Sequence, residues 1–222
     1  MKPLLRNYVF KVRKNSVMLI HLILYLLFQL EKMEINAFHL RENDYMGLAR
    51  SQKLSELSLN NALHLTSRGV TEILKLENLR VLALIRANSL NGSDFARILA
   101  SKSLANVTDL TFWDCQSLIG EEFSSFFETL NDVWPKPLKT LELRYCKNLN
   151  DLSIGIIIQI CNQLKILDLG GCKNLTESCM EEIVKYLKPS LNTLIISSGN
   201  LSDECVKMLK DNIKVVKLHD IA

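Results

Sequence analysis

The sequence predicts an α/β solenoid shaped like a horseshoe, with parallel strands on a concave face and helices on a convex face. Three observations carry this prediction. A nine-residue apolar frame recurs along the chain, a polar landmark follows most copies at a steady distance, and apolar residues at helical spacing follow that landmark. With 222 residues, 48% of them hydrophobic, the chain can bury a core. A net charge of +3 is too small to indicate a nucleic-acid partner.

Residues 1–29 precede the first copy of the frame. Basic residues up to Lys14 lead into the apolar run Val17–Phe28, an order that is also found in signal peptides. That run is too short for a comfortable membrane span, and no small-residue cleavage site follows it. The favoured interpretation is a helical cap or degenerate repeat at 1–29, ahead of a repeat domain at 30–222. A signal or anchor is the alternative, although a membrane association is not favoured.

The frame is L-x-x-L-x-L-x-x-C. Its copies begin 22 to 31 residues apart, about 26 on average, which corresponds to about seven repeats. This period lies in the range of roughly 20–29 residues that is typical of leucine-rich repeats. The clearest copies begin at Val107, Leu138, Leu164 and Leu191, and weaker ones at Leu30, Leu54, Leu79 and Ile213.

Within each frame, alternate side chains of the strand face opposite ways. Leu167 and Leu169 are expected to enter the core while Asp168 faces solvent. Cys172, the last residue of its frame, should turn inward where space is tight and a small apolar group fits. Seven residues share its position: Phe38, Ala62, Ala87, Cys115, Cys146, Gly199 and Ile221.

A second landmark follows most copies of the frame, as a leucine and then a polar residue. Thr66, Asn91, Asn150, Thr176 and Ser202 share one position there and are suited to be helix N-caps, since their side-chain oxygens can accept free backbone N–H groups. The runs 153–161 and 179–187 have apolar residues at helical spacing. Each repeat is therefore predicted to be a strand, a capped turn and a helix.

The cysteines favour a buried, reduced set of thiols. Cys115, Cys146 and Cys172 recur at one position of successive clear repeats and are expected to stack as a buried ladder, while Cys161, Cys179 and Cys205 fall in helical runs. No C-x-x-C pair occurs, so neither zinc nor another metal is expected. The usage favours a cytoplasmic or nuclear protein.

Catalytic motifs are absent from the sequence. It contains no G-x-S-x-G, P-loop or H-E-x-x-H, and its four histidines are scattered. Glu142 and Asp168 are expected to lie near each other on adjacent strands, but a solvated surface explains them better than a catalytic pair. We expect no enzyme activity and no cofactor.

A protein-binding surface is the favoured functional feature. The outward positions of neighbouring strands bring Trp113, Arg144 and Tyr145 together, beside the acids Asp114, Glu142 and Asp168. Trp, Tyr and Arg are the residue types enriched at interface hot spots. These six residues are the candidate site, with a protein as the partner on the concave face.

A family resemblance follows from the segment "CNQLKILDLGGCKNLTESCMEEI", Cys161–Ile183. It resembles the cysteine-containing subclass of leucine-rich repeats, which is typical of F-box/leucine-rich-repeat proteins and of the repeat-only antagonist of the mitotic exit network. The resemblance covers roughly Leu30 to Ile221. It implies a substrate-binding part of an SCF-type ubiquitin ligase, acting in ubiquitin-dependent protein catabolism with a Skp-type adaptor and a cullin.

Two alternatives stay open. Residues 1–29 contain no recognisable F-box, with a degraded F-box helix the least favoured interpretation of them, so the chain could instead be a repeat-only scaffold or inhibitor without ligase contact. A secreted or membrane-tethered recognition domain is the other alternative. It would use N-glycosylation sequons such as those that begin at Asn106, Asn174 and Asn200.

Overall fold

The computed structural model describes residues 30–117, 123, 137–197, 199 and 201–219. The described strands form one parallel sheet in which every strand pairs with its neighbours in sequence. An α/β fold with a parallel sheet is therefore confirmed. The strands are β1 (Lys32–Asn36), β2 (Glu56–Asn60), β3 (Val81–Ile85), β4 (Asp109–Trp113), β5 (Thr140–Arg144), β6 (Ile166–Asp168), β7 (Thr193–Ser197) and β8 (Val215–His219).

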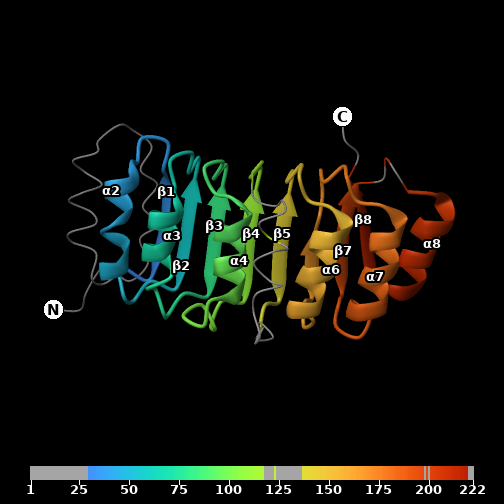
Figure 1. Ribbon diagram of the computed structural model, residues 1–222. Helices are drawn as coiled ribbons and strands as arrows, with labels where there is room; N and C mark the ends of the chain where they lie inside the picture. The colour runs from blue at the N-terminus through green and yellow to red at the C-terminus, as the bar shows by residue number, and fades with distance from the viewer. Residues whose placement is uncertain (1–29, 118–122, 124–136, 198, 200, 220–222) are drawn as a thin grey trace.

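The described helices pack along one face of this sheet (Figure 1). Across the part of the chain that is described, none is long and apolar enough to cross a membrane. The predicted cap at 1–29 lies outside the described residues. The helices are α2 (Glu42–Tyr45), α3 (Ser67–Ile73), α4 (Gly92–Ala100), α6 (Asp151–Ile160), α7 (Glu177–Leu187) and α8 (Asp203–Asn212), with a 3₁₀ turn η1 (Leu48–Arg50).

The core lies between the sheet and these helices. In strand β2, Leu57 and Leu59 are buried while the residues between and beside them are partly exposed, as a period of two requires. Helix α6 contributes Ile154, Ile157 and Ile158, which share one face at helical spacing and are fully buried. Burying one such aliphatic side chain stabilises the fold by about 1.5–3 kcal/mol. The side chains on the opposite side of the strands form what we call the strand face.

A residue in the left-handed conformation precedes the last residue of the frame in five successive repeats. At the eighth position, one residue before the small buried one, φ is positive in every case: 56° in Asn61, Arg86 and Tyr145, 55° in Asp114 and 82° in Gly171. For residues other than glycine this conformation is uncommon and costs free energy. Here it turns the backbone at the end of the strand, and the residue that follows is buried in the core.

The first repeat departs from this rule, and the prediction that Phe38 is buried is wrong. Ala37 occupies the small buried position with no exposure, while Phe38 is 49% exposed. The backbone N–H of Leu40 donates to the carbonyl of Ala37, as that of Leu65 does to Ala62. This repeat lacks the left-handed residue, so its turn is one residue shorter.

The cysteines of the ladder form hydrogen bonds to the preceding repeat. The thiol of Cys172 donates to the carbonyl of Leu143 at 2.9 Å, and Cys115 and Cys146 donate to Leu84 and Phe112 at 3.5 and 3.7 Å. Each acceptor is the sixth frame residue of the preceding repeat. All six cysteines are buried and free. Burial raises the pKa of Cys115 to about 11 and that of Cys172 to about 12.

The five predicted N-caps all begin helices, but they act in two ways. The side chains of Asn91, Asn150 and Ser202 accept from a backbone N–H in their own first turn. Thr66 and Thr176 instead use their hydroxyls to donate to the acids Glu42 and Asp151 in the helix of the preceding repeat. The prediction of helix starts is confirmed, and these threonines tie adjacent helices together.

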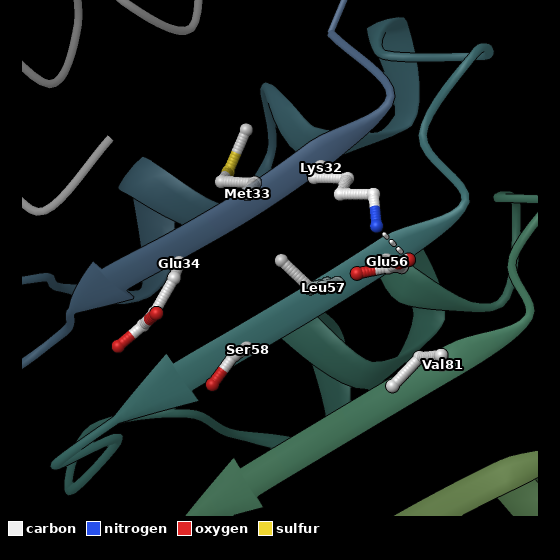
Figure 2. A pocket seen from close by; sticks show the side chains of 7 residues that line it. All are labelled: Lys32, Met33, Glu34, Glu56, Leu57, Ser58 and Val81. Carbon is white, nitrogen blue, oxygen red and sulfur yellow. Dashed lines mark ion pairs between the residues drawn. The ribbon is translucent and has the colours of Figure 1, made fainter. Parts of the chain in front are cut away.

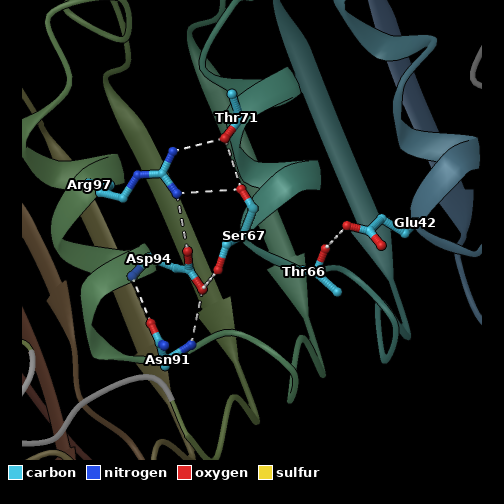
Figure 3. A network of polar contacts seen from close by, with 7 residues as sticks. All are labelled: Glu42, Thr66, Ser67, Thr71, Asn91, Asp94 and Arg97. Atoms are coloured by element: carbon cyan, nitrogen blue, oxygen red, sulfur yellow. Dashed lines mark hydrogen bonds and ion pairs between the residues drawn. The ribbon is translucent and has the colours of Figure 1, made fainter.

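Asp94 joins α4 to α3 (Figure 3). Its buried carboxylate accepts from the hydroxyl of Ser67 at 2.9 Å and from the backbone N–H of Asn91 at 3.3 Å, and it pairs with Arg97 at 3.4 Å. The guanidinium of Arg97 also donates to the hydroxyl of Thr71 at 2.9 Å. The helix side of these repeats is thus held by side-chain bonds as well as by apolar packing.

Candidate functional site

Trp113, Arg144 and Tyr145 lie together on the strand face, where β4 and β5 end. Their placement follows from the register, in which Trp113 is the direct partner of Arg144. The rings of Trp113 and Tyr145 stack at 6.4 Å between centroids, and the guanidinium of Arg144 lies 5.9 Å from the centre of the Trp113 ring. Trp113 remains 40% exposed. These rings therefore present a partly ordered, accessible aromatic surface.

Asp168 holds the guanidinium of Arg144 in place. Its guanidinium Nε lies 2.6 Å from Asp168 Oδ2, and the second nitrogen lies 2.5 Å from the same oxygen. The hydrogen bond to Asp168 raises the pKa of Arg144, so its charge is permanent. Asp168 Oδ1 accepts in turn from the backbone N–H of Gly170 at 3.0 Å.

The prediction that Asp168 faces solvent is wrong, because this residue is fully buried. Strand alternation places it on the strand face as expected, but Arg144 and the chain at Gly170 take up its oxygens. Asp168 is therefore a positioning residue for Arg144 and is inaccessible to a partner.

Glu142 lies beside this pair without joining it. It is the direct cross-strand partner of Asp168, as predicted, yet among the described residues Arg144 forms its ion pair with Asp168 alone. Glu142 is half-buried, and that burial raises its pKa; the charge of Arg144 opposes the rise, and the charges of Asp168 and Asp109 add to it. Among the described residues, Glu142 makes no hydrogen bond or ion pair.

Asp114 follows Trp113 in the left-handed turn and is tied to its neighbours. It pairs with Arg86 of the preceding repeat at 3.3 Å, and it accepts from the side-chain amide of Gln116. The Gln116 amide also donates to the carbonyl of Tyr145 at 3.3 Å. The turn that carries Trp113 is thus braced from both adjacent repeats.

His219 belongs to this site, and sequence reasoning did not include it. The Tyr145 hydroxyl lies 2.9 Å from His219 Nε2, and the two rings meet edge to face at 5.7 Å. A Cβ on Gly170 would lie 2.8 Å from the His219 ring, and one on Gly171 would overlap the Tyr145 ring. The two consecutive glycines of "LDLGGC" were the signal, since no other frame has glycine at both positions.

Elsewhere on the strand face, a hollow of about 120 Å³ lies over β1, β2 and β3 (Figure 2). Ligand sites usually measure roughly 300–1,000 Å³, so this one is small for an organic cofactor. Lys32 and Glu56 close one side of it with an ion pair of 2.5 Å. In the described part of the chain, no group of three His, Cys, Asp or Glu residues is placed to hold a metal.

Comparison with known proteins shows little beyond general likeness. No family model matches the chain, and no curated protein matches its sequence. Among solved structures, it is similar to one described as the crystal structure of the Rad7 and Elc1 complex in yeast, at 17% identity and a TM-score of 0.37. The match covers 90% of this chain and 72% of the other.

Proposed function

We propose that this chain is a leucine-rich-repeat module of about seven repeats, curved as a horseshoe, that recognises another protein through its strand face. The observation that carries the proposal is the accessible pair of stacked rings at Trp113 and Tyr145, ordered by Arg144. Aromatic and arginine side chains supply a large part of the binding energy at protein interfaces. Here they need little further ordering, because the contacts described above already hold them.

We also propose that the module is not an enzyme and uses no cofactor. The carboxylate pair considered for a catalytic role in the sequence is Glu142 with Asp168. Asp168 is buried, and its Oδ2 oxygen is engaged by Arg144. Such a carboxylate has no access to a substrate bond, which a general acid or base must reach.

The more specific proposal is a substrate-binding part of an SCF-type ubiquitin ligase, reached through a Skp-type adaptor and a cullin. Its support is the resemblance of the repeats to the cysteine-containing subclass. A repeat-only scaffold or inhibitor is the alternative, and it shares the same binding face. The two differ in whether an adaptor and a cullin accompany the chain.

A cytoplasmic or nuclear location is proposed from the buried free thiols and from two of the sequons. The Asn106 side-chain amide donates to the carbonyl of Glu77 at 3.1 Å, and that of Asn174 to Lys147 at 2.7 Å. A glycan is attached through the same nitrogen and would interfere with these bonds between repeats. Asn200 itself lies outside the described residues.

The test is affinity purification of the tagged chain from its native cells, compared with Trp113→Ala. Leu152→Ala is the matched control, because Leu152 is a large apolar residue on α6 that is also exposed. Arg144→Ala is unsuitable, since it leaves the buried carboxylate of Asp168 without its partner. We expect partners that are lost from the Trp113→Ala sample and kept by the control.

A Skp-type adaptor and a cullin that are retained by Trp113→Ala would support the ligase assignment. Partners without an adaptor would favour the scaffold. Equal partner sets from the wild type and from Trp113→Ala would contradict the proposed face, and a glycosylated chain would contradict the proposed compartment.

A further inference from the structure

The strand face has an imbalance of charge that its own ion pairs do not remove. Among the described residues of this face, the basic side chains are those of Lys32, Arg86, Arg144 and, on β8, Lys217. The first three are paired with the acids Glu56, Asp114 and Asp168 and are already neutralised. Lys217 lies three strands away from Glu142 across the sheet.

Three further acids on the same region have no ion pair with any described residue: Glu34, Asp109 and Glu142. Glu34 receives a long hydrogen bond of 3.4 Å from Asn60, and Asp109 accepts from the hydroxyl of Thr108 at 2.7 Å. Figure 2 shows Glu34 pointing away from the Lys32–Glu56 pair. The strand face beside the aromatic rings is thus net negative.

Of these three acids, Glu142 lies nearest to the aromatic rings in the register of the sheet. It lies two residues before Arg144 on β5, and its cross-strand partner on β4 is Thr111, two residues before Trp113. It is half-buried and without a hydrogen-bond partner among the described residues. A half-buried carboxylate without hydrogen bonds is poorly solvated. An ion pair with a cation would compensate the carboxylate for the hydration that it has lost.

We infer that the partner segment that binds this face is basic, and that one of its lysine or arginine side chains pairs with Glu142 against the exposed Trp113 ring. This inference rests on the proposed function and names the chemistry of its partner. A cation between a carboxylate and an aromatic ring gains from both the charge and the ring quadrupole. Nucleic acid and anionic lipid would be repelled by the same surface.

The experiment is an array of random 12-residue peptides probed with the tagged full-length chain at low salt. The expected result is enrichment of lysine and arginine among the bound peptides. One enriched peptide is then labelled, and its Kd is measured by fluorescence anisotropy for the wild type, Glu142→Gln, Trp113→Ala and Leu152→Ala. We expect Glu142→Gln to weaken binding by about three- to tenfold, Trp113→Ala to weaken it at least as much, and Leu152→Ala to leave it unchanged.

Glu142→Gln keeps the shape of the side chain and removes a poorly solvated charge, so we expect the variant to fold, which a melting curve checks. Bound peptides that are acidic or neutral, an unchanged Kd for Glu142→Gln, or no binding above background would each overturn the inference. Acidic or neutral peptides that still need Trp113 would leave the proposed face intact. A peptide Kd that Trp113→Ala leaves unchanged would contradict the proposed face itself.

Discussion

The hydroxyl of Tyr145 and the Nε2 of His219 lie 2.9 Å apart, which joins the turn after β5 to the strand β8. The two residues are 74 positions apart in sequence. Their rings close over the backbone at Gly170 and Gly171, where side chains would collide with them. This contact explains why the repeat between them has two glycines, and it connects the candidate site to the last described strand.

Replacing Gly171 by alanine should destabilise the fold more than replacing Gly170. Gly171 has φ of +82° and faces the Tyr145 ring, so an alanine side chain there would strain both backbone and packing, at a cost of about 1–3 kcal/mol or more. At Gly170 the obstacle is the His219 ring, which can move aside. Urea unfolding measures both. Gly199→Ala is the control, because nothing lies within 4 Å of its added carbon. Equal losses of stability in Gly170→Ala and Gly171→Ala would contradict the predicted difference between the two glycines.

Removing Arg144 should cost far more stability than removing Arg86. Arg144→Ala leaves the buried Asp168 unpaired, a change that typically costs about 3–5 kcal/mol. Arg86→Ala breaks an exposed pair with Asp114 and should cost about 1 kcal/mol or less. Chemical denaturation compares the two variants. The double change Arg144→Ala, Asp168→Ala should recover part of the loss, and no recovery would mean that Arg144 acts mainly through packing.

The stability of the fold should fall at alkaline pH, in part through the buried thiols. The pKa of Cys115 is raised from 9.0 to about 11, so between these values the unfolded chain releases a proton that the folded chain retains. The free energy of unfolding must then decrease as the pH rises through this window. Guanidinium unfolding at pH 8 and pH 10.5 measures the decrease. It should be smaller in Cys115→Ala, which removes this group, and an equal decrease would contradict the contribution of Cys115.

The contribution of the N-cap residue to stability should differ between repeats with similar sequences. Asn91→Ala removes an oxygen that accepts from the backbone N–H of Asp94 and should cost about 1 kcal/mol. Thr66→Ala removes a partly buried hydroxyl bond to Glu42 and no cap of its own helix, so a smaller loss is expected. Thermal melting of both variants tests this difference. A larger loss for Thr66→Ala would show that the bonds between helices matter more than the caps.

Most of the fold could be predicted from local pattern. The strands, their parallel order and the five helix starts follow from a repeated frame, because each repeat packs chiefly on its neighbours. The shift from Phe38 to Ala37 could not be predicted, since it depends on a turn that is one residue shorter than in the other repeats. The position of that turn is set by hydrogen bonds to the next strand, and Ala37 donates to Asn60 in this way.

The candidate site, like the fold, could be predicted from the sequence only in part. The sequence by itself determined that Trp113, Arg144 and Tyr145 share a face, because alternation and repeat spacing set which side chains are neighbours. Only the tertiary structure decided that Asp168 is buried beneath Arg144, that Glu142 is left without a partner among the described residues, and that His219 closes over the glycines. The physical reason is that ion pairs, desolvation and contacts across three strands depend on side-chain positions in space, which a periodic pattern does not specify.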